Sequence, residues 1–384
     1  MVLLPVFSMA QIKHDYLISR MNASVLLEDT VLTNLWGYGR YNTGTAIRIT
    51  LPGPLLRYYT NDSVVIHFWN DSPEHHTIHL HGLDANQAND GVPSTSFPIL
   101  QNDSTTYSFK ALYPGTYLYH CHVTTTLHLA MGMYGMLVVD HPNNLMYQNG
   151  PGYNKDYAFL SSDMDRSWND MPTSPGPFHE YEANYFMVNG KSGLQLFTDT
   201  SQIMRINAGD SVLLRLANVG YTISEYCFPI GTNPVIHMSD GRVLPSPVPI
   251  DTLKIYPGER YSILLKPTTF IADYICVSYI DMFNDNQLGT NFIGINQNYH
   301  PNSVYEMEIS DWKIFPNPTE NIIFIESNQY KENERIYFYN IQGQLVYTYK
   351  LSSTIEKIDL SFLESGIYIL KSDQREKAYK LIVK

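Results

Sequence analysis

Short runs of hydrophobic residues, some of them alternating with polar residues, recur along most of the chain. Examples in the first third are VVIHFWN (64–70), YLYHCHV (117–123) and MYGMLVVD (133–140), and later examples are YFMVNGKSG, SVLLRLANVGY and IDTLKIYPGERYSILL. Such alternation, with turn residues between the runs, is typical of β-strands that have one face in a core. Because no long run has the 3.6-residue spacing of an amphipathic helix, the pattern predicts an all-β protein.

Composition divides the predicted strands into three segments. The stretch from Asn143 to Pro177 is rich in Asn, Gly and Pro and is predicted to be a linker with a surface excursion. We therefore expect one β-domain over residues 25–145 and a second over 146–312. Residues 313–384 carry 10 Lys and Arg against 9 Asp and Glu, a net charge of +1, whereas the preceding residues carry 15 against 28, or −13. This shift predicts a separate small β-sandwich at the C-terminus.

Charge and hydropathy exclude some classes of partner. The net charge of −12 disfavours nucleic acid, because a phosphate backbone is bound by a basic surface. No run approaches the roughly 20 apolar residues of a membrane-spanning helix. The apolar start MVLLPVFSMAQ ends in small residues, and we interpret residues 1–11 as the remainder of a secretory signal. An ordinary first strand is the alternative.

Histidines gather in one part of the sequence. Seven of the thirteen lie between residues 75 and 128, mostly in the motifs HHTIHLHG (75–82) and HCH (120–122). Successive side chains of a strand point to opposite faces, so histidines two residues apart share a face. The histidines with this spacing are His79, His81, His120 and His122. Cys121 would point away from its two neighbours, which predicts two separate metal sites back to back across one strand.

The site of Cys121 would need further ligands. His76 precedes the paired histidines, and His128 and Met133 follow the cysteine after a short loop. Two imidazoles, one thiolate and a distant thioether form the ligand set of blue-copper electron-transfer sites. A lone buried cysteine or histidine is more often part of a core, and zinc is the competing metal. The repeated histidine spacing favours metal binding, and the mixed donor set favours copper.

At these motifs the sequence resembles the multicopper oxidase family, over about residues 45–290. The matching motifs of the first domain are LPGPLLRYYTNDSVVIHFWN, HTIHLHG, DGVP, PGTYLYHCHV and HCHVTTTLHLAMGM. Those of a second, copper-free domain are FMVNGK, SDGRVLP and IYPGERYSILL. The resemblance implies two cupredoxin-like domains, each a Greek-key β-barrel or sandwich, with copper as the cofactor.

The resemblance also implies a role for each candidate residue. The expected ligands of a type 1 copper are His76, Cys121, His128 and Met133. The expected ligands of a type 2/type 3 trinuclear copper centre are His79, His81, His120 and His122. Asp90 of DGVP corresponds to an acidic residue that relays protons to that centre, and it is the candidate catalytic residue.

The second region departs from the pattern of a complete oxidase. The family's trinuclear centre uses eight histidines, of which the first domain offers four. The second region has only His179, His237 and His300, and none of them is in an H-x-H pair. Either the centre is incomplete or a neighbouring chain contributes, which would make the protein a homo-oligomer.

Three functions are compatible with these residues. The first is a copper oxidoreductase that takes single electrons from a small-molecule or metal-ion reductant and passes them to oxygen. The second is a blue-copper protein that carries electrons or binds copper without catalysis. The third is an enzyme like the copper nitrite reductases, which take one type 2 ligand from a neighbour's second domain. The comparable strand here, DYICVSYIDMFND, has no histidine, which counts against the third.

The C-terminal segment resembles the type A sorting domain of the type IX secretion system of Bacteroidetes. The matching features are IFPNPTENIIFI, FYNIQGQLVYTY, IDLSFLESGIYILK and the basic close KAYKLIVK. The resemblance implies export through the periplasm by the type IX machinery, to the cell surface or the medium. Cys227 and Cys276, on predicted second-domain strands, would then either form a disulfide or remain two core thiols.

Overall fold

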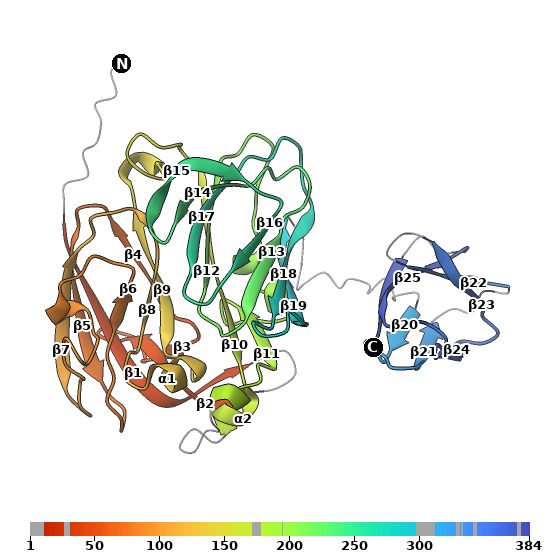
Figure 1. Ribbon diagram of the computed structural model, residues 1–384, viewed down its shortest axis with the longest axis horizontal. Helices are drawn as coiled ribbons and strands as arrows, with labels where there is room; N and C mark the ends of the chain where they lie inside the picture. The colour runs from red at the N-terminus through yellow and green to blue at the C-terminus, as the bar shows by residue number, and fades with distance from the viewer. Residues whose placement is uncertain are drawn as a thin grey trace. The chain divides into compact units, whose positions relative to one another are not determined.

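The structure is a computed structural model, and it confirms the all-β prediction (Figure 1). It describes residues 11–26, 31–170, 178–193, 195–296, 312–327, 331, 333–340, 344–374 and 378–384. The chain divides into two compact units, residues 1–299 and 300–384. Of the predicted signal remnant, residues 1–10 lie outside the described residues. No helix in the described ranges is long and apolar enough to cross a membrane.

The first domain is a sandwich of two sheets. One sheet has the order β3 (Ile49–Thr50), β2 (Val31–Arg40), β1 (Ile12–Leu26), β5 (Ser63–Asn70) and β7 (Ser104–Lys110). The other has the order β4 (Gly53–Tyr59), β9 (Tyr134–Asp140), β8 (Gly115–His120) and β6 (His79–His81). Residues of β5 alternate between exposed and buried, as the sequence pattern predicts. The inner faces meet in a core rich in aromatic side chains.

The first sheet begins upstream of the predicted residue 25. Strand β1 pairs in parallel with β5, from Ile12 opposite Ser63 to Ser19 opposite Asn70. It also pairs with β2 in an antiparallel hairpin. The end of this hairpin reaches the second domain, where the Gln195 side chain donates a hydrogen bond to the Leu26 carbonyl at 2.8 Å.

The second domain repeats this plan. Its larger sheet has the order β11 (Tyr185–Val188), β10 (Lys155–Met164), β12 (Val212–Asn218), β17 (Arg260–Leu265), β14 (Val235–Ser239) and β15 (Arg242–Pro249). Its smaller sheet has the order β16 (Thr252–Ile255), β13 (Ile223–Cys227), β18 (Asp273–Ile280) and β19 (Gln287–Ile295). Cys227 and Cys276 lie opposite each other on β13 and β18 and are not joined by a disulfide.

Strand β10 corrects one prediction. It lies within residues 143–177, which the composition had marked as a linker. It runs parallel to β12 and antiparallel to β11, and its second half, from Phe159 to Met164, is buried. The run KDYAFLSSDM contains five small or apolar residues in a row, 158–162, and shows no clear alternation, because both faces of its buried half are covered. Tertiary pairing makes this segment a strand.

Short helices connect the strands. The α-helices are α1 (Thr125–Ala130), α2 (Arg166–Asp170) and α3 (Gln195–Thr198). The 3₁₀-helices are η1 (Gln87–Asn89), η2 (Pro142–Asn144), η3 (Phe178–Glu180) and η4 (Thr200–Gln202). All are short, in agreement with the absence of a long amphipathic pattern.

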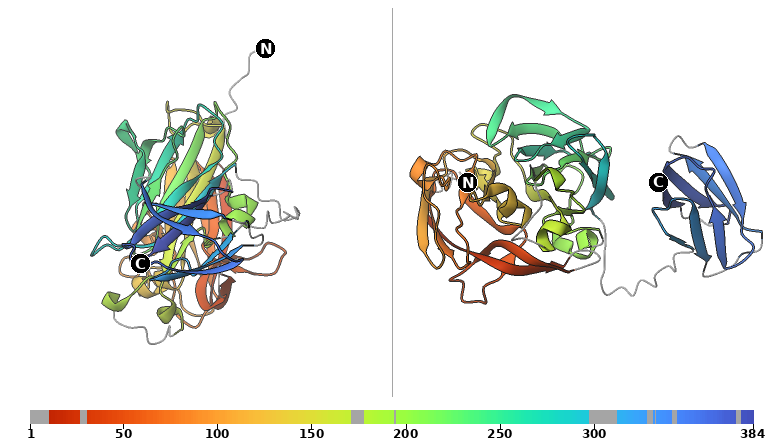
Figure 2. Two further views of the ribbon diagram at one scale, coloured as in Figure 1. Left: turned by 90° about the vertical axis from the view of Figure 1, so that its right-hand side faces the viewer. Right: turned by 60° about the horizontal axis from the view of Figure 1, so that its bottom comes forward.

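The first two domains are packed against each other as one unit (Figure 2, right). A shared hydrophobic cluster contains Leu118 and Val138 of the first domain and Leu160 and Val219 of the second. The buried guanidinium of Arg215 forms ion pairs with Asp140 of the first domain and Asp156 of the second. Because apolar burial and buried ion pairs both cross the junction, the domains are fixed relative to each other.

A buried carboxylate stabilises the second domain where it faces the first. Oδ2 of Asp163 accepts hydrogen bonds from the backbone N–H groups of Tyr221 and Thr222, both at 2.8 Å, and from the Thr222 hydroxyl at 2.7 Å. Its Oδ1 accepts a fourth from the Tyr181 hydroxyl at 3.0 Å. Burial raises the pKa of Asp163, while these four donors oppose the rise. The carboxylate therefore fixes the loop that carries Tyr221.

We expect Asp163→Ala to lower the free energy of unfolding of the two-domain unit by about 3 kcal/mol or more, because it leaves buried donors without an acceptor. Calorimetric unfolding of the full chain measures this change. The control is Asp170→Ala, which removes a half-exposed carboxylate paired with Arg166 and should change stability by less than about 1 kcal/mol. Equal effects of the two substitutions would contradict the role given to Asp163.

The C-terminal unit is a small sandwich of its own. Its sheets have the orders β20 (Trp312–Phe315), β21 (Ile322–Ser327), β24 (Ile355–Asp359) and β23 (Leu345–Lys350), β22 (Arg335–Asn340), β25 (Gly366–Ser372), β26 (Ala378–Val383). Its core contains Ile323, Phe338 and Leu370.

Candidate metal centre

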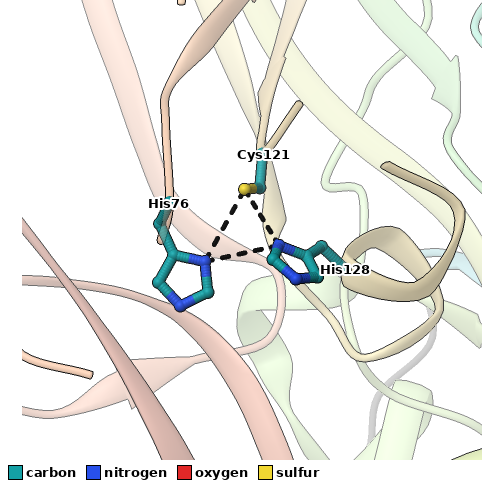
Figure 3. A group of neighbouring side chains, drawn as sticks. All are labelled: His76, Cys121 and His128. Carbon is teal, nitrogen blue, oxygen red and sulfur yellow. Dashed lines mark hydrogen bonds between the residues drawn. The ribbon is translucent and has the colours of Figure 1, made fainter. Parts of the chain in front are cut away.

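Three side chains converge in the core of the first domain (Figure 3). The Cys121 Sγ lies 3.1 Å from the Nδ1 atom of His128 and 3.7 Å from the Nδ1 atom of His76. The two Nδ1 atoms are 3.3 Å apart. All three residues are fully buried. The structure therefore brings together one sulfur and two nitrogen donors, which we call the cysteine cluster.

Three different segments supply these side chains. Cys121 directly follows β8, and its backbone N–H donates to the Met133 carbonyl at 3.1 Å. His128 lies on α1, a short helix preceded by Thr124 in the left-handed conformation (φ 42°). The Thr77 N–H points at the Cys121 sulfur at 3.5 Å, next to His76. Backbone hydrogen bonds thus help to position the donors.

The spacing of the cysteine cluster fits a bound metal ion. With metal–nitrogen distances of about 2.0 Å and metal–sulfur distances of about 2.3 Å, as for zinc, donors in a trigonal plane lie about 3.5–3.7 Å apart. The observed separations of 3.1–3.7 Å are close to these values. A trigonal set of two histidines and one cysteine is typical of blue copper. The residues therefore fit copper.

Met133, the fourth predicted ligand, lies beside the cluster. It is fully buried, and its N–H donates to the His128 carbonyl at 2.9 Å. Its carbonyl accepts the bond from Cys121 described above. Its role as a weak axial ligand remains a prediction from the resemblance.

Burial sets the charge of the cysteine cluster. It lowers the pKa of His76 to about 3 and that of His128 to about 4, so both imidazoles are neutral at pH 7 and have lone pairs for a metal. Burial also raises the pKa of the Cys121 thiol to about 11. In the metal-free protein the thiol is therefore protonated, and a metal must displace its proton.

Copper(I) binding at pH 7 is consequently expected to release about one proton per chain, and the affinity of the cysteine cluster should rise about tenfold per pH unit between pH 6 and 9. The affinity rises with pH because copper competes with the proton of the Cys121 thiol, and the proton is held less strongly as the pH approaches the thiol pKa of about 11. A pH-stat titration measures the protons. Cys121→Ser should release none, and unchanged release in that variant would refute this account.

A second group of histidines faces a cavity of about 320 Å³. Ligand atoms of His79, His81 and His120 all lie within 4.8 Å of one another. His122 lines the same cavity, with its ring centroid 5.1 Å from that of His79. Burial lowers the pKa of His120 to about 3 and that of His81 to about 4. We call this group the histidine cavity.

Hydrogen bonds orient two of these rings. The Nδ1–H of His79 can donate to the Asp90 carbonyl at 2.7 Å, and the Nδ1–H of His120 to the Cys121 carbonyl at 3.0 Å. These bonds leave Nε2 of each ring as the lone-pair donor. The predicted catalytic residue Asp90 also has a carboxylate oxygen 3.3 Å from His79 Nδ1. It therefore contacts the histidine cavity from the side.

The HCH motif lies at the end of a strand rather than inside one. Strand β8 ends at His120, and Cys121 and His122 follow it without regular structure. The side chains nevertheless face opposite ways, since Cys121 joins the cysteine cluster while both histidines line the cavity. Pairing of His79 with His120 across β6 and β8 brings the two motifs together.

Sequence analysis missed several residues around the two clusters. Glu74 has a carboxylate oxygen 3.4 Å from Nε2 of His128 and is 44% exposed. The hydroxyl oxygen of Thr77 accepts a hydrogen bond from the His122 N–H at 3.0 Å. The second domain contributes Tyr221 and Gly258 to the cavity. Glu74 and Thr77 adjoin or lie inside the first motif and could have been found there, but no local pattern marks the second-domain residues.

Comparisons with known proteins show the family of this chain. Family models described as multicopper oxidase match residues 36–144 and 153–301, and a model of the secretion system C-terminal sorting domain matches 313–384. A structure titled blue copper oxidase from Nitrosomonas europaea has a TM-score of 0.59 at 25% identity, covering 78% of this chain and 95% of that one. The multicopper oxidase mgLAC has a TM-score of 0.60 at 26% identity, covering 77% and 90%.

Curated relatives are longer proteins. Laccase-15 of Oryza sativa subsp. japonica is 28% identical over 263 residues, which cover 65% of this chain and 41% of that protein. A copper resistance protein A homolog of Pseudomonas syringae pv. tomato is 38% identical over 273 residues, which cover 60% and 45%. The chain therefore spans less than half the length of these relatives.

The sandwich domains and the matched family models define a cupredoxin-like copper protein followed by a sorting domain. The chain belongs to the multicopper oxidase family, whose members are copper proteins, and its type IX sorting domain marks it for export to the cell surface or for secretion.

Proposed function

We propose that this protein is an exported copper oxidoreductase that oxidises a reductant one electron at a time at the cysteine cluster and delivers the electrons to oxygen at the histidine cavity. Copper bound at both places would supply the one-electron chemistry. The observation that carries the proposal is that one segment, residues 120–122, supplies donors to both clusters.

This segment offers a short path between the clusters. Cys121 is covalently joined to His120 and His122, which line the cavity. The hydrogen bond between the His120 ring and the Cys121 carbonyl adds a second connection. An electron that enters at the sulfur therefore crosses only a few bonds before it reaches an imidazole.

The outer edge of the cysteine cluster offers an entrance for electrons. His128 is buried, but its Nε2 atom lies beside the half-exposed carboxylate of Glu74. A small molecule or metal ion at Glu74 would be one side chain away from the cluster, and the negative charge would favour cations or hydrogen-bond donors. At the other site, the Asp90 carboxylate beside His79 is placed to hold or pass a proton during oxygen reduction.

Oxygen uptake by the copper-loaded chain tests this function. A phenol and a reducing metal ion are supplied separately, and we expect oxidation of at least one of them to require both copper and oxygen. If the blue colour is bleached by the reductant and does not return in air, the protein is an electron carrier instead. If anaerobic oxidation occurs with nitrite, it is a nitrite reductase. The sorting domain supports delivery through the periplasm by type IX machinery, so activity is expected outside the cell.

A further inference from the structure

The wall opposite the histidines belongs to the chain's own second domain and lacks metal ligands. Besides the four histidines, the cavity is lined by Leu118, Thr125, Leu129, Val219, Gly220, Tyr221, Pro257 and Gly258. The last five come from the second domain. None of them is a histidine, cysteine or carboxylate, so this side could not supply the other half of an eight-histidine centre.

This wall is fixed in place. The Tyr221 hydroxyl donates to the Thr126 carbonyl at 2.7 Å and so ties the loop to α1. The Asp163 carboxylate holds the N–H of Tyr221. A Cβ atom added to Gly258 would lie 3.3 Å from Cε1 of His81, so the turn packs directly against a candidate ligand. On this side of the cavity, donors from a second copy would have to displace a wall that is anchored in the shared core.

Histidines elsewhere in the described second domain do not approach the cavity. His237 is on β14 and lies 3.4 Å from the Tyr147 hydroxyl. His179 is 80% exposed on η3. Neither is next to another histidine, so a second copy of this chain could offer only isolated donors from these described positions.

The charge around the cavity also limits the number of metal ions. The guanidinium of Arg260 is buried and packs over Gly82, next to His81. Arg260 forms an ion pair with Asp240 at 2.8 Å, but the Asp240 carboxylate is half exposed, so solvent weakens the compensation of the buried positive charge. Among the residues that the structure describes, no carboxylate lines the cavity, and Asp90 contacts only the His79 ring at its edge. Several divalent ions close together would repel one another unless bridging anions from solvent compensated their charge.

We infer that the histidine cavity is a site for a single copper ion, held by His79, His81 and His120 and bounded on one side by the chain's own second domain. Three imidazoles leave one position open for an exogenous ligand, as in catalytic three-histidine sites. The fully loaded chain thus holds two copper ions, one in each cluster, instead of four. This inference rests on the proposed function, which requires copper at both clusters.

Copper and spin counts test the inference without an activity assay. The full chain is loaded with copper, desalted and fully oxidised, and its copper content is compared with its integrated electron paramagnetic resonance signal. One isolated ion per cluster gives two copper ions and two unpaired spins per chain. Two bridged copper(II) ions couple their spins and become silent, so four coppers with two spins, or three with one, would overturn the inference. One blue copper with an empty cavity would overturn it as well.

Variants locate the second ion. His81→Ala should reduce both counts from two to one and keep the blue signal. His237→Ala, which removes a histidine outside the cavity, should keep both counts at two. Retention of two coppers in His81→Ala would refute the ligand assignment. A wild-type chain with no blue signal, or with an empty cavity, would contradict the proposed function itself, whereas additional copper with silent spins would overturn only the single-ion inference.

Discussion

Replacing Cys121 with serine is expected to abolish the intense blue absorption of the copper-loaded protein, reducing it by more than about tenfold. The colour of such sites comes from charge transfer between a thiolate sulfur and copper, and a serine oxygen does not replace a soft sulfur ligand. His76 and His128 remain in place, because backbone hydrogen bonds and α1 position them. Absorption spectroscopy of equally loaded samples measures the loss.

Cys227→Ser is the matched control for that experiment. Cys227 lies on β13 in the second domain and faces Cys276 on β18, away from both clusters. This variant should keep the full blue absorption. A blue Cys121→Ser protein would show that the sulfur ligand is another residue and would remove the basis of the proposed function.

Replacing His79 with alanine should leave the blue colour intact and abolish oxygen-coupled turnover, in contrast to Cys121→Ser. We expect the blue absorption to remain, because His79 lies on β6 and does not contact the cysteine cluster. Oxygen-coupled oxidation should fall by more than about 100-fold, since loss of a direct ligand exceeds the 10–100-fold cost of losing a residue that supports one. Stopped-flow reduction of the blue copper, followed by oxygen uptake, separates the two steps.

His14→Ala provides a control for His79→Ala. His14 is an exposed histidine at the start of β1, where it contacts only the neighbouring His67 ring among the interactions described. Turnover and colour should both be unchanged. If His79→Ala turned over oxygen as fast as this control, oxygen reduction would not take place in the histidine cavity.

Alternation in the sequence predicted the main strands well where one face is buried. Residues 64–70 lie in β5, which has one buried face, and the turn in IDTLKIYPGERYSILL separates β16 from β17. Strand β9 (Tyr134–Asp140) is buried throughout and was predicted from its apolar run. Strand β10 was missed because both faces of its second half are buried, so its sequence shows no alternation. Its identity depends on partners that are distant in sequence.

In the metal centre, too, features set by local sequence could be predicted, whereas features that depend on distant residues could not. Spacing within each motif predicted which side chains share a face, and the structure places Cys121 beside His76 and His128. Sequence spacing did not predict that β8 would end at His120. The second-domain wall was also unpredictable, because Tyr221 and Gly258 have no ligand chemistry and reach the cavity only through the packing of the two domains.

Cys121 lies between two histidines that line the cavity, so the alternating directions of these three side chains are essential for both sites. Each residue from 120 to 122 reverses direction, so the same short stretch addresses the interior core and the inter-domain space in turn. Inserting one residue before His120 would send the sulfur toward the imidazoles and an imidazole into the core. Single-residue insertions or deletions here would therefore damage both sites at once, whereas substitutions can alter them separately.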